Sequence, residues 1–246
     1  MITAARKLFL LHLLANALLL WLAYEWLGVG ESTRLRLVWS ALDGLAILAL
    51  VAWFHGATLV FFRAGEPKIN GAFRAALGHV PVLLAAAILV LVLYGLLAWA
   101  AAASVPSAFQ FASWLTLKLR TPVKPAAMMR ISLAAFWIVR WVVVPVALLP
   151  MVSGLAARGW RGAAEFGWRG GWRYWLEVPL LLVAGLWLPF VVLGWVPAVS
   201  GFALEMLSFS VRMLVAYLLF VGALWTLEWV TSRLPLSSYV KPRPAR

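Results

Sequence analysis

Four ionisable side chains lie inside long apolar stretches of the sequence, where charged residues are rare. Asp43 and Arg140 each interrupt one such stretch, and Glu205 and Arg212 share a third. A charge within a membrane segment is energetically costly, so it usually faces protein or a water-filled cavity. Guanidinium and carboxylate groups in that setting either neutralise each other or bind an ion of opposite charge. These four residues are the first candidates for an internal polar site.

Their depths allow three of these residues to meet. If expected helices at 37–62, 131–154 and 202–231 run in the same direction, Arg140 and Arg212 lie about 14 Å below the outer ends and Asp43 about 9 Å. Glu205 is about two turns nearer the surface than Arg212, on the same helix face. Two arrangements follow. Asp43 neutralises one arginine and leaves the other for an anionic ligand, or Asp43 and Glu205 neutralise both arginines in a closed network.

Two histidines form a second candidate group. His12 and His55 are expected near the inner ends of adjacent antiparallel helices. Histidines on facing helices are able to ligate a b-type haem, but histidines in polar seams between helices are commoner than haem ligands. No other cofactor or metal signature accompanies them, so no cofactor and no metal is expected.

The sequence lacks the residues and motifs that several kinds of catalysis require. The chain has no cysteine, which excludes disulfides, thiolate metal sites and cysteine nucleophiles. It also has no HExxH, GxSxG or Walker motif. Isolated carboxylates such as Glu228 remain, but no pattern distinguishes them. Catalysis is therefore not expected.

The elements that must position these residues are membrane helices. The 246 residues are 65% hydrophobic and 12% charged, whereas soluble domains have about half and a quarter. Six apolar stretches reach the roughly 20 residues that cross a bilayer as a helix. The sequence thus predicts an all-α, polytopic transmembrane helical bundle, with residues 1–246 forming one membrane-embedded domain. The predicted spans are 8–27, 37–62, 80–103, 131–154, 174–196 and 202–231.

The segments between the spans are interfacial. Residues 104–130 are apolar but short, so they are expected to lie in the outer interface or to enter and return. Residues 232–246 form a basic tail that is expected to be cytosolic. The loop after the fourth span repeats Gly-Trp-Arg, and its aromatic and cationic side chains suit anionic lipid headgroups. The expected lipid contacts are Trp160, Arg161, Trp168, Arg169, Trp172 and Arg173.

The net charge of +13 sits mostly at helix ends and in short loops. This placement indicates membrane topology and attraction to anionic lipid, and it argues against nucleic-acid binding. Basic residues are more numerous on the side that holds both termini. The positive-inside rule then predicts a bacterial-type inner membrane protein with both termini in the cytoplasm.

These features suggest two functions. The first is a permease or transporter subunit that handles an anionic or lipidic substrate at the internal arginine site, with a cytosolic partner or an ion gradient supplying energy. The second is a non-transporting structural or assembly subunit of a larger membrane complex. A water-accessible polar cavity at Arg140 favours the first function, and an arginine sealed by carboxylates favours the second.

Overall fold

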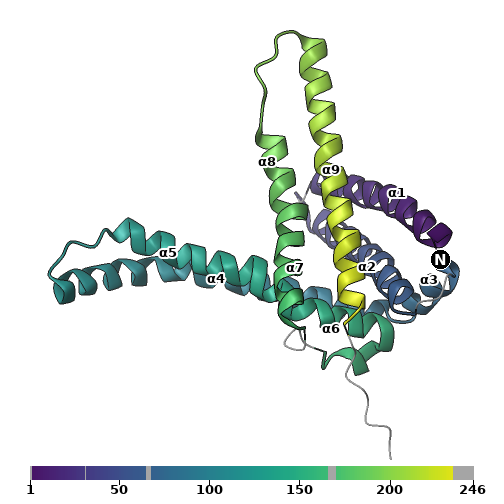
Figure 1. Cartoon of the computed structure of the whole chain (residues 1–246), viewed down its shortest axis with the longest axis horizontal. Helices are drawn as coiled ribbons and strands as arrows, with labels where there is room; N and C mark the ends of the chain where they lie inside the picture. Colours follow the sequence, from purple (N-terminus) through teal and green to yellow (C-terminus); the bar gives the residue numbers. More distant parts are fainter. Residues whose placement is uncertain (1, 31, 65–67, 166–169, 235–246) are drawn as a thin grey trace, which may run out of the picture.

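The structure is a computed structural model, and it describes residues 2–30, 32–64, 68–165 and 170–234. Within these ranges the chain is helical apart from short connections, and it contains no strand. Six helical segments are long and apolar enough to cross a membrane. The all-α, six-helix prediction is therefore confirmed, and the chain is a multi-pass membrane protein. The helices form three hairpins that diverge from a shared base (Figure 1).

The first hairpin pairs α1 (Ile2–Leu27) with α2 (Arg34–Ala64). At its closed end, the Trp26 indole nitrogen of α1 donates a hydrogen bond to the Ser40 carbonyl of α2 at 2.8 Å. Helix α2 is central to the molecule, because it packs against α1, α4, α6, α9 and the short helix α3 (Ile69–Leu77). Groups on α2 are thus placed to meet groups from several hairpins.

The second hairpin is the longest. Helix α4 (Val80–Leu119) runs alongside α5 (Pro125–Ile138), the π-helical turn η1 (Val139–Val143) and α6 (Val144–Arg158), which ends in the 3-10 turn η2 (Gly159–Gly162). Residues 104–130 form the distal part of this hairpin, because α4 continues through Pro106 to Leu119. At 40 residues, α4 is about 60 Å long, twice the thickness of a hydrocarbon core.

The third hairpin joins α7 (Trp172–Leu182), the π-helical turn η4 (Val183–Trp187) and α8 (Leu188–Gly194) to α9 (Phe202–Ser232). Both π-helical turns in the described part of the molecule end two residues before a proline. The amide of Val144 donates to the Val139 carbonyl ahead of Pro145, and the amide of Leu188 donates to the Val183 carbonyl ahead of Pro189. Proline has no amide proton, and the wider turn accommodates the interruption without ending the helix.

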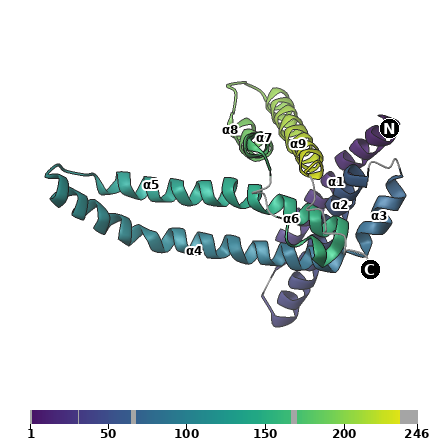
Figure 2. The same cartoon turned by 60° about the horizontal axis from the view of Figure 1, so that its bottom comes forward.

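We call the shared base of the hairpins the hub. It contains three buried apolar clusters, centred on Leu155 with Leu83, on Val146 with Val178, and on Leu8 with Phe61. Away from the hub the hairpins separate, and in both views the α4/α5 hairpin extends away from the other two (Figures 1 and 2). The hub is consequently the place where side chains from all three hairpins come together.

Candidate functional site

Three ionisable side chains meet in the hub, each from a different membrane-length helix. His12 comes from α1, His55 from α2 and Glu228 from α9. One imidazole nitrogen of each histidine and one carboxylate oxygen of Glu228 all lie within 4.8 Å of one another. His12 is fully buried and Glu228 is 7% exposed. We call these three residues the His-His-Glu cluster.

Glu228 lies between the two histidines and interacts with both. Its Oε1 is hydrogen bonded to His55 Nδ1, and its Oε2 lies 3.3 Å from His12 Nε2. Although Oε2 is buried, it accepts no hydrogen bond. A buried carboxylate oxygen without a hydrogen bond is energetically unfavourable. Glu228 Oε2 can therefore still accept a hydrogen bond or bind a cation.

Two polar residues orient the ring of His12. Its Nε2 lies 2.8 Å from Thr58 Oγ1 on α2, and Thr58 donates in turn to the Phe54 carbonyl at 3.2 Å. On the other side of the ring, Nδ1 lies 3.4 Å from the amide nitrogen of Asn16. Asn16 also donates to the His12 carbonyl at 2.9 Å. Every polar atom of the ring therefore faces a polar partner, although the site is enclosed.

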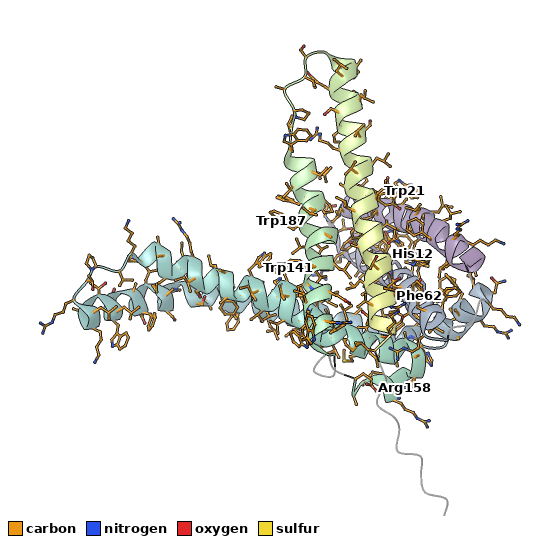
Figure 3. The ribbon with its side chains drawn as sticks, viewed as in Figure 1. His12, Trp21, Phe62, Trp141, Arg158 and Trp187 are labelled. Atoms are coloured by element: carbon orange, nitrogen blue, oxygen red, sulfur yellow. The ribbon has the colours of Figure 1, made fainter. Side chains whose placement is uncertain are left out.

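Aromatic rings form the walls of the cluster. The His12 ring centroid lies 4.7 Å from that of Phe54 and 5.2 Å from that of Trp225. Phe54 also packs edge-on against His55 at 5.2 Å. Figure 3 shows His12 and Phe62 in the region where α1, α2 and α9 cross. Because these rings limit access of water, electrostatic interactions among the three ionisable groups are strong.

Further polar contacts hold the hub together. The Arg63 guanidinium donates to Ser153 Oγ of α6 at 2.7 Å. Arg158 is paired with the buried Glu165, which follows η2. The His79 Nδ1 atom lies 2.8 Å from the Ala156 carbonyl. These contacts link α2, α6 and the start of α4, and they fix the frame around the His-His-Glu cluster.

The structure brings His12 and His55 together, with ring centroids 5.7 Å apart. A haem held by both histidines would need its porphyrin plane between the two rings. The Glu228 carboxylate lies there and contacts both rings. The arrangement therefore fits the polar seam and not the haem.

The four residues predicted from charge lie on three separate hairpins. Asp43 is on α2, Arg140 is on η1, and Glu205 and Arg212 are on α9. None of the four forms an ion pair with another residue that the structure describes. The α2, α6 and α9 helices do meet, as the predicted site required. They meet at the hub, however, and are farther apart at the positions along the helices where these four residues lie.

Each arginine finds partners within its own hairpin. The Arg140 guanidinium carbon lies 5.5 Å from the ring centroid of Tyr94 on α4 and 5.2 Å from that of Trp141. Arg212 donates to the Leu193 carbonyl of α8 at 2.8 Å. Cation–π contacts and backbone carbonyls thus replace the carboxylates that the sequence led us to expect. Asp43 is half-buried and Glu205 is exposed.

A groove lies beside Arg140, between the second and third hairpins. Its volume is about 470 Å³, and aromatic residues on both sides line it, including Trp137, Trp141, Trp187 and Phe190. Trp141 and Trp187 are labelled in Figure 3 at the base of these hairpins. The lining is apolar, so this is neither the polar cavity nor the carboxylate seal that the two functional interpretations predicted for Arg140.

The expected lipid-contact residues lie on the surface of the hub. Trp160 is 66% and Trp172 is 72% exposed, and the Arg161 and Arg173 side chains are also exposed. The Arg173 guanidinium carbon lies 5.6 Å from the Trp172 ring centroid. Trp168 and Arg169 lie outside the described residues, as does the tail from residue 235.

The prediction from sequence missed Glu228, Thr58 and the role of Asn16. Glu228 does not share the helix face of Glu205 and Arg212, so helical periodicity did not single it out. The depth of Glu228 in the membrane was the sequence feature that could have identified it. At 1.5 Å per residue, Glu228 lies about 6 Å from the inner end of its helix, in the same range as His12 and His55.

No family model, no curated protein and no solved structure matches this chain. The class of the protein, a multi-pass helical membrane protein, therefore rests on its six apolar helices. Its functional site rests on the geometry of the hub.

Proposed function

We propose that the protein is a permease-type transport subunit whose His-His-Glu cluster binds a cation, either the substrate or a coupling ion, during transport. The observation that carries this proposal is the meeting of three ionisable side chains, with His12 and Glu228 buried and His55 partly exposed, where three membrane-length helices cross. Ionisable residues inside membrane segments are rare and commonly mark ion pathways. Since the three helices belong to two hairpins, movement of α9 relative to α1 and α2 would open or close the site.

The charge of the cluster favours a cation. Glu228 contributes a carboxylate, and neutral imidazole contributes lone pairs. The Glu228 Oε2 atom already lacks a hydrogen-bond donor, and a bound cation would satisfy it. The partly buried arginines of the hub, Arg63 and Arg158, are instead engaged with Ser153 and Glu165.

Proteoliposomes test this proposal. A voltage-sensitive dye would report net charge movement as gradients of H⁺, Na⁺, K⁺ and divalent cations are applied in turn. We expect one gradient to produce a signal with the natural protein and not with Glu228→Gln, which keeps the size of the side chain and removes its charge. Glu205→Gln is the matched control, because Glu205 lies exposed on the same helix and should leave the signal unchanged.

Two other outcomes decide between the alternatives. If correctly inserted protein gives no signal above empty liposomes for any gradient, a structural or assembly subunit of a larger complex is the better interpretation. If Arg140→Gln abolishes the signal while Glu228→Gln keeps it, transport depends on the arginine instead.

An anionic, lipid-like substrate at Arg140 is the second candidate function. The Nε atom of Arg140 is buried and has no hydrogen-bond partner, and no described carboxylate neutralises the side chain. The adjacent groove shares Trp141 with Arg140, so an acyl chain in the groove would place its headgroup near the guanidinium. A phosphate there would supply both the missing acceptor and the opposite charge.

We further propose a bacterial-type inner membrane location with the hub at the cytoplasmic side of the membrane. Basic residues at the hub end, such as Lys7, Arg63, Arg74 and Arg161, support this orientation through the positive-inside rule. Trp160 and Trp172 would then lie among headgroups of the inner leaflet, with Arg161 and Arg173 pairing with anionic lipid. A cytosolic or membrane partner subunit would dock on the same side.

A further inference from the structure

We infer that His12, His55 and Glu228 bind a divalent transition-metal ion with the preferences of Zn²⁺. This inference deepens the proposed function and rests on its assignment of the His-His-Glu cluster as the functional site. Two imidazoles and one carboxylate are a common ligand set for zinc sites in which a fourth position stays open. Other first-row ions that favour nitrogen and oxygen ligands, such as Co²⁺ and Fe²⁺, use the same set.

The distances suit such an ion. Ligand atoms about 2.0 Å from a tetrahedral zinc ion are about 3.3 Å from one another. The separation of His12 Nε2 and Glu228 Oε2 is 3.3 Å, and all three ligand atoms lie within 4.8 Å of one another. The His55 side chain is 20% exposed, so it has room to rotate where a separation must shorten.

The three ligands are held by different helices and by buried packing. His12 is enclosed by Phe54 and Trp225, and Glu228 lies on the face of α9 that packs into the hub. An ion bound to all three would cross-link α1, α2 and α9. Hard cations such as Mg²⁺ and Ca²⁺ prefer all-oxygen ligand sets, so the two imidazoles select against them.

Asn16 acts as a positioning residue for this site. A metal ion at Nε2 of His12 requires the ring proton on Nδ1, and such a proton needs an acceptor. The side-chain amide of Asn16 is the polar group at Nδ1, 3.4 Å away, and it provides the acceptor when its oxygen turns towards the ring. Thr58 Oγ1, 2.8 Å from Nε2, would give up its bond to the ring and lie beside the ion.

Titration with Co²⁺ tests the inference, because tetrahedral Co²⁺ has characteristic visible absorption bands and Zn²⁺ displaces it. The full chain would be purified in detergent and treated with a chelator first. We expect one Co²⁺ per chain and full displacement by Zn²⁺. Glu228→Gln and His55→Gln should each weaken binding by at least about 100-fold, more than the loss of an orienting partner does. Asn16→Leu should weaken binding by about 10–100-fold and change the absorption bands.

A matched control distinguishes this site from general binding. Glu205→Gln removes a carboxylate outside the cluster, on the same helix as Glu228, and should bind Co²⁺ as the natural protein does. If Glu228→Gln fails to fold, the half-buried His55→Gln decides. The inference is overturned if the natural protein binds no Co²⁺, or if His55→Gln binds it equally well.

The outcome for metal binding is separable from the outcome for transport. Charge movement that requires Glu228, in a protein that binds no Co²⁺ or Zn²⁺, would overturn the metal assignment and leave the proposed function in place. Stoichiometric metal binding without charge movement for any cation gradient would overturn transport and leave the metal site.

Discussion

At the scale of single residues, the cluster depends on side chains that have no charge. Thr58 is fully buried and is the hydrogen-bond partner of His12 Nε2. It also holds its own hydroxyl in place through the Phe54 carbonyl. Since the walls of the site are aromatic, no solvent is positioned to replace this hydroxyl, and the orientation of His12 depends on it.

Replacing Thr58 with valine should therefore destabilise the protein. The substitution keeps the shape of the side chain and leaves the buried His12 nitrogen without its partner, which costs about 1–3 kcal/mol of the free energy of unfolding. Unfolding in mixed micelles, followed by circular dichroism, measures the change. Thr226→Val is the control, because Thr226 bonds only the Gly222 carbonyl of its own helix. Equal stability of the two variants would contradict the role of Thr58.

At the scale of helices, small residues set how closely the two arms of a hairpin approach each other. Gly185 lies in η4, where a Cβ atom would be 2.6 Å from the Cβ of Ala223 on α9. In membranes, helices associate through close van der Waals packing at such small residues, since apolar burial gives little driving force between them. Close packing at Gly185 therefore holds η4 against α9, on the hub side of the connection that contains Trp195.

Gly185→Ala should loosen this hairpin. The added methyl group meets a rigid neighbour instead of the flexible end of a side chain, so we expect a loss of about 1–3 kcal/mol in the free energy of unfolding. Gly194→Ala, in the same hairpin, has no atom within 4 Å of its new Cβ and should change stability little. The same micelle unfolding experiment compares the two. A stable Gly185→Ala protein would show that α9 is not fixed at this point.

At the scale of the whole molecule, the three hairpins leave an unusually large surface. The accessible area is 16474 Å², whereas a compact soluble protein of 27.1 kDa exposes about 11,000 Å². Much of the excess is apolar, as at Leu89, Trp99 and Leu117 of α4, which are 66%, 71% and 81% exposed. An apolar surface of this kind is suited to contact with lipid.

The arrangement of hairpins predicts the sidedness of the chain. The three connections, which include residues 28–30, 120–124 and 195–201, lie at the ends of the hairpins away from the hub (Figure 1), so all three should face one side of the membrane. Because the sequence has no cysteine, single cysteines at Ser32, Thr121 and Ser200 can be labelled without background. We expect an impermeant thiol reagent to label all three from outside the cell.

A cysteine at Arg74, which is exposed on α3 of the hub, supplies the opposite result. It should react only after the membrane is permeabilised. Labelling of Thr121→Cys from the cytoplasmic side would mean that the α4/α5 hairpin does not cross the membrane as the other two hairpins do. Thr121 is the most informative of these positions, because α4, with 40 residues, is longer than a bilayer requires.

The sequence by itself determined the number and type of the membrane-length segments. Backbone polar groups in lipid must be satisfied within each segment, so six long apolar stretches could only be helices. Asn16 and His12, four residues apart, were already on one helix face for the same local reason. The proximity of His12 and His55 was also expected from depth, which depends on each helix separately, but depth did not decide between a polar seam and a haem.

Only the tertiary structure decided which charges meet. Asp43, Arg140 and Arg212 have matching depths, yet they belong to hairpins that diverge at that level, and the convergence lies instead at Glu228. Where helices meet depends on contacts between segments that are distant in sequence, such as Gly185 with Ala223 and Arg63 with Ser153. Hydropathy and periodicity describe one segment at a time, and they contain no information about these contacts.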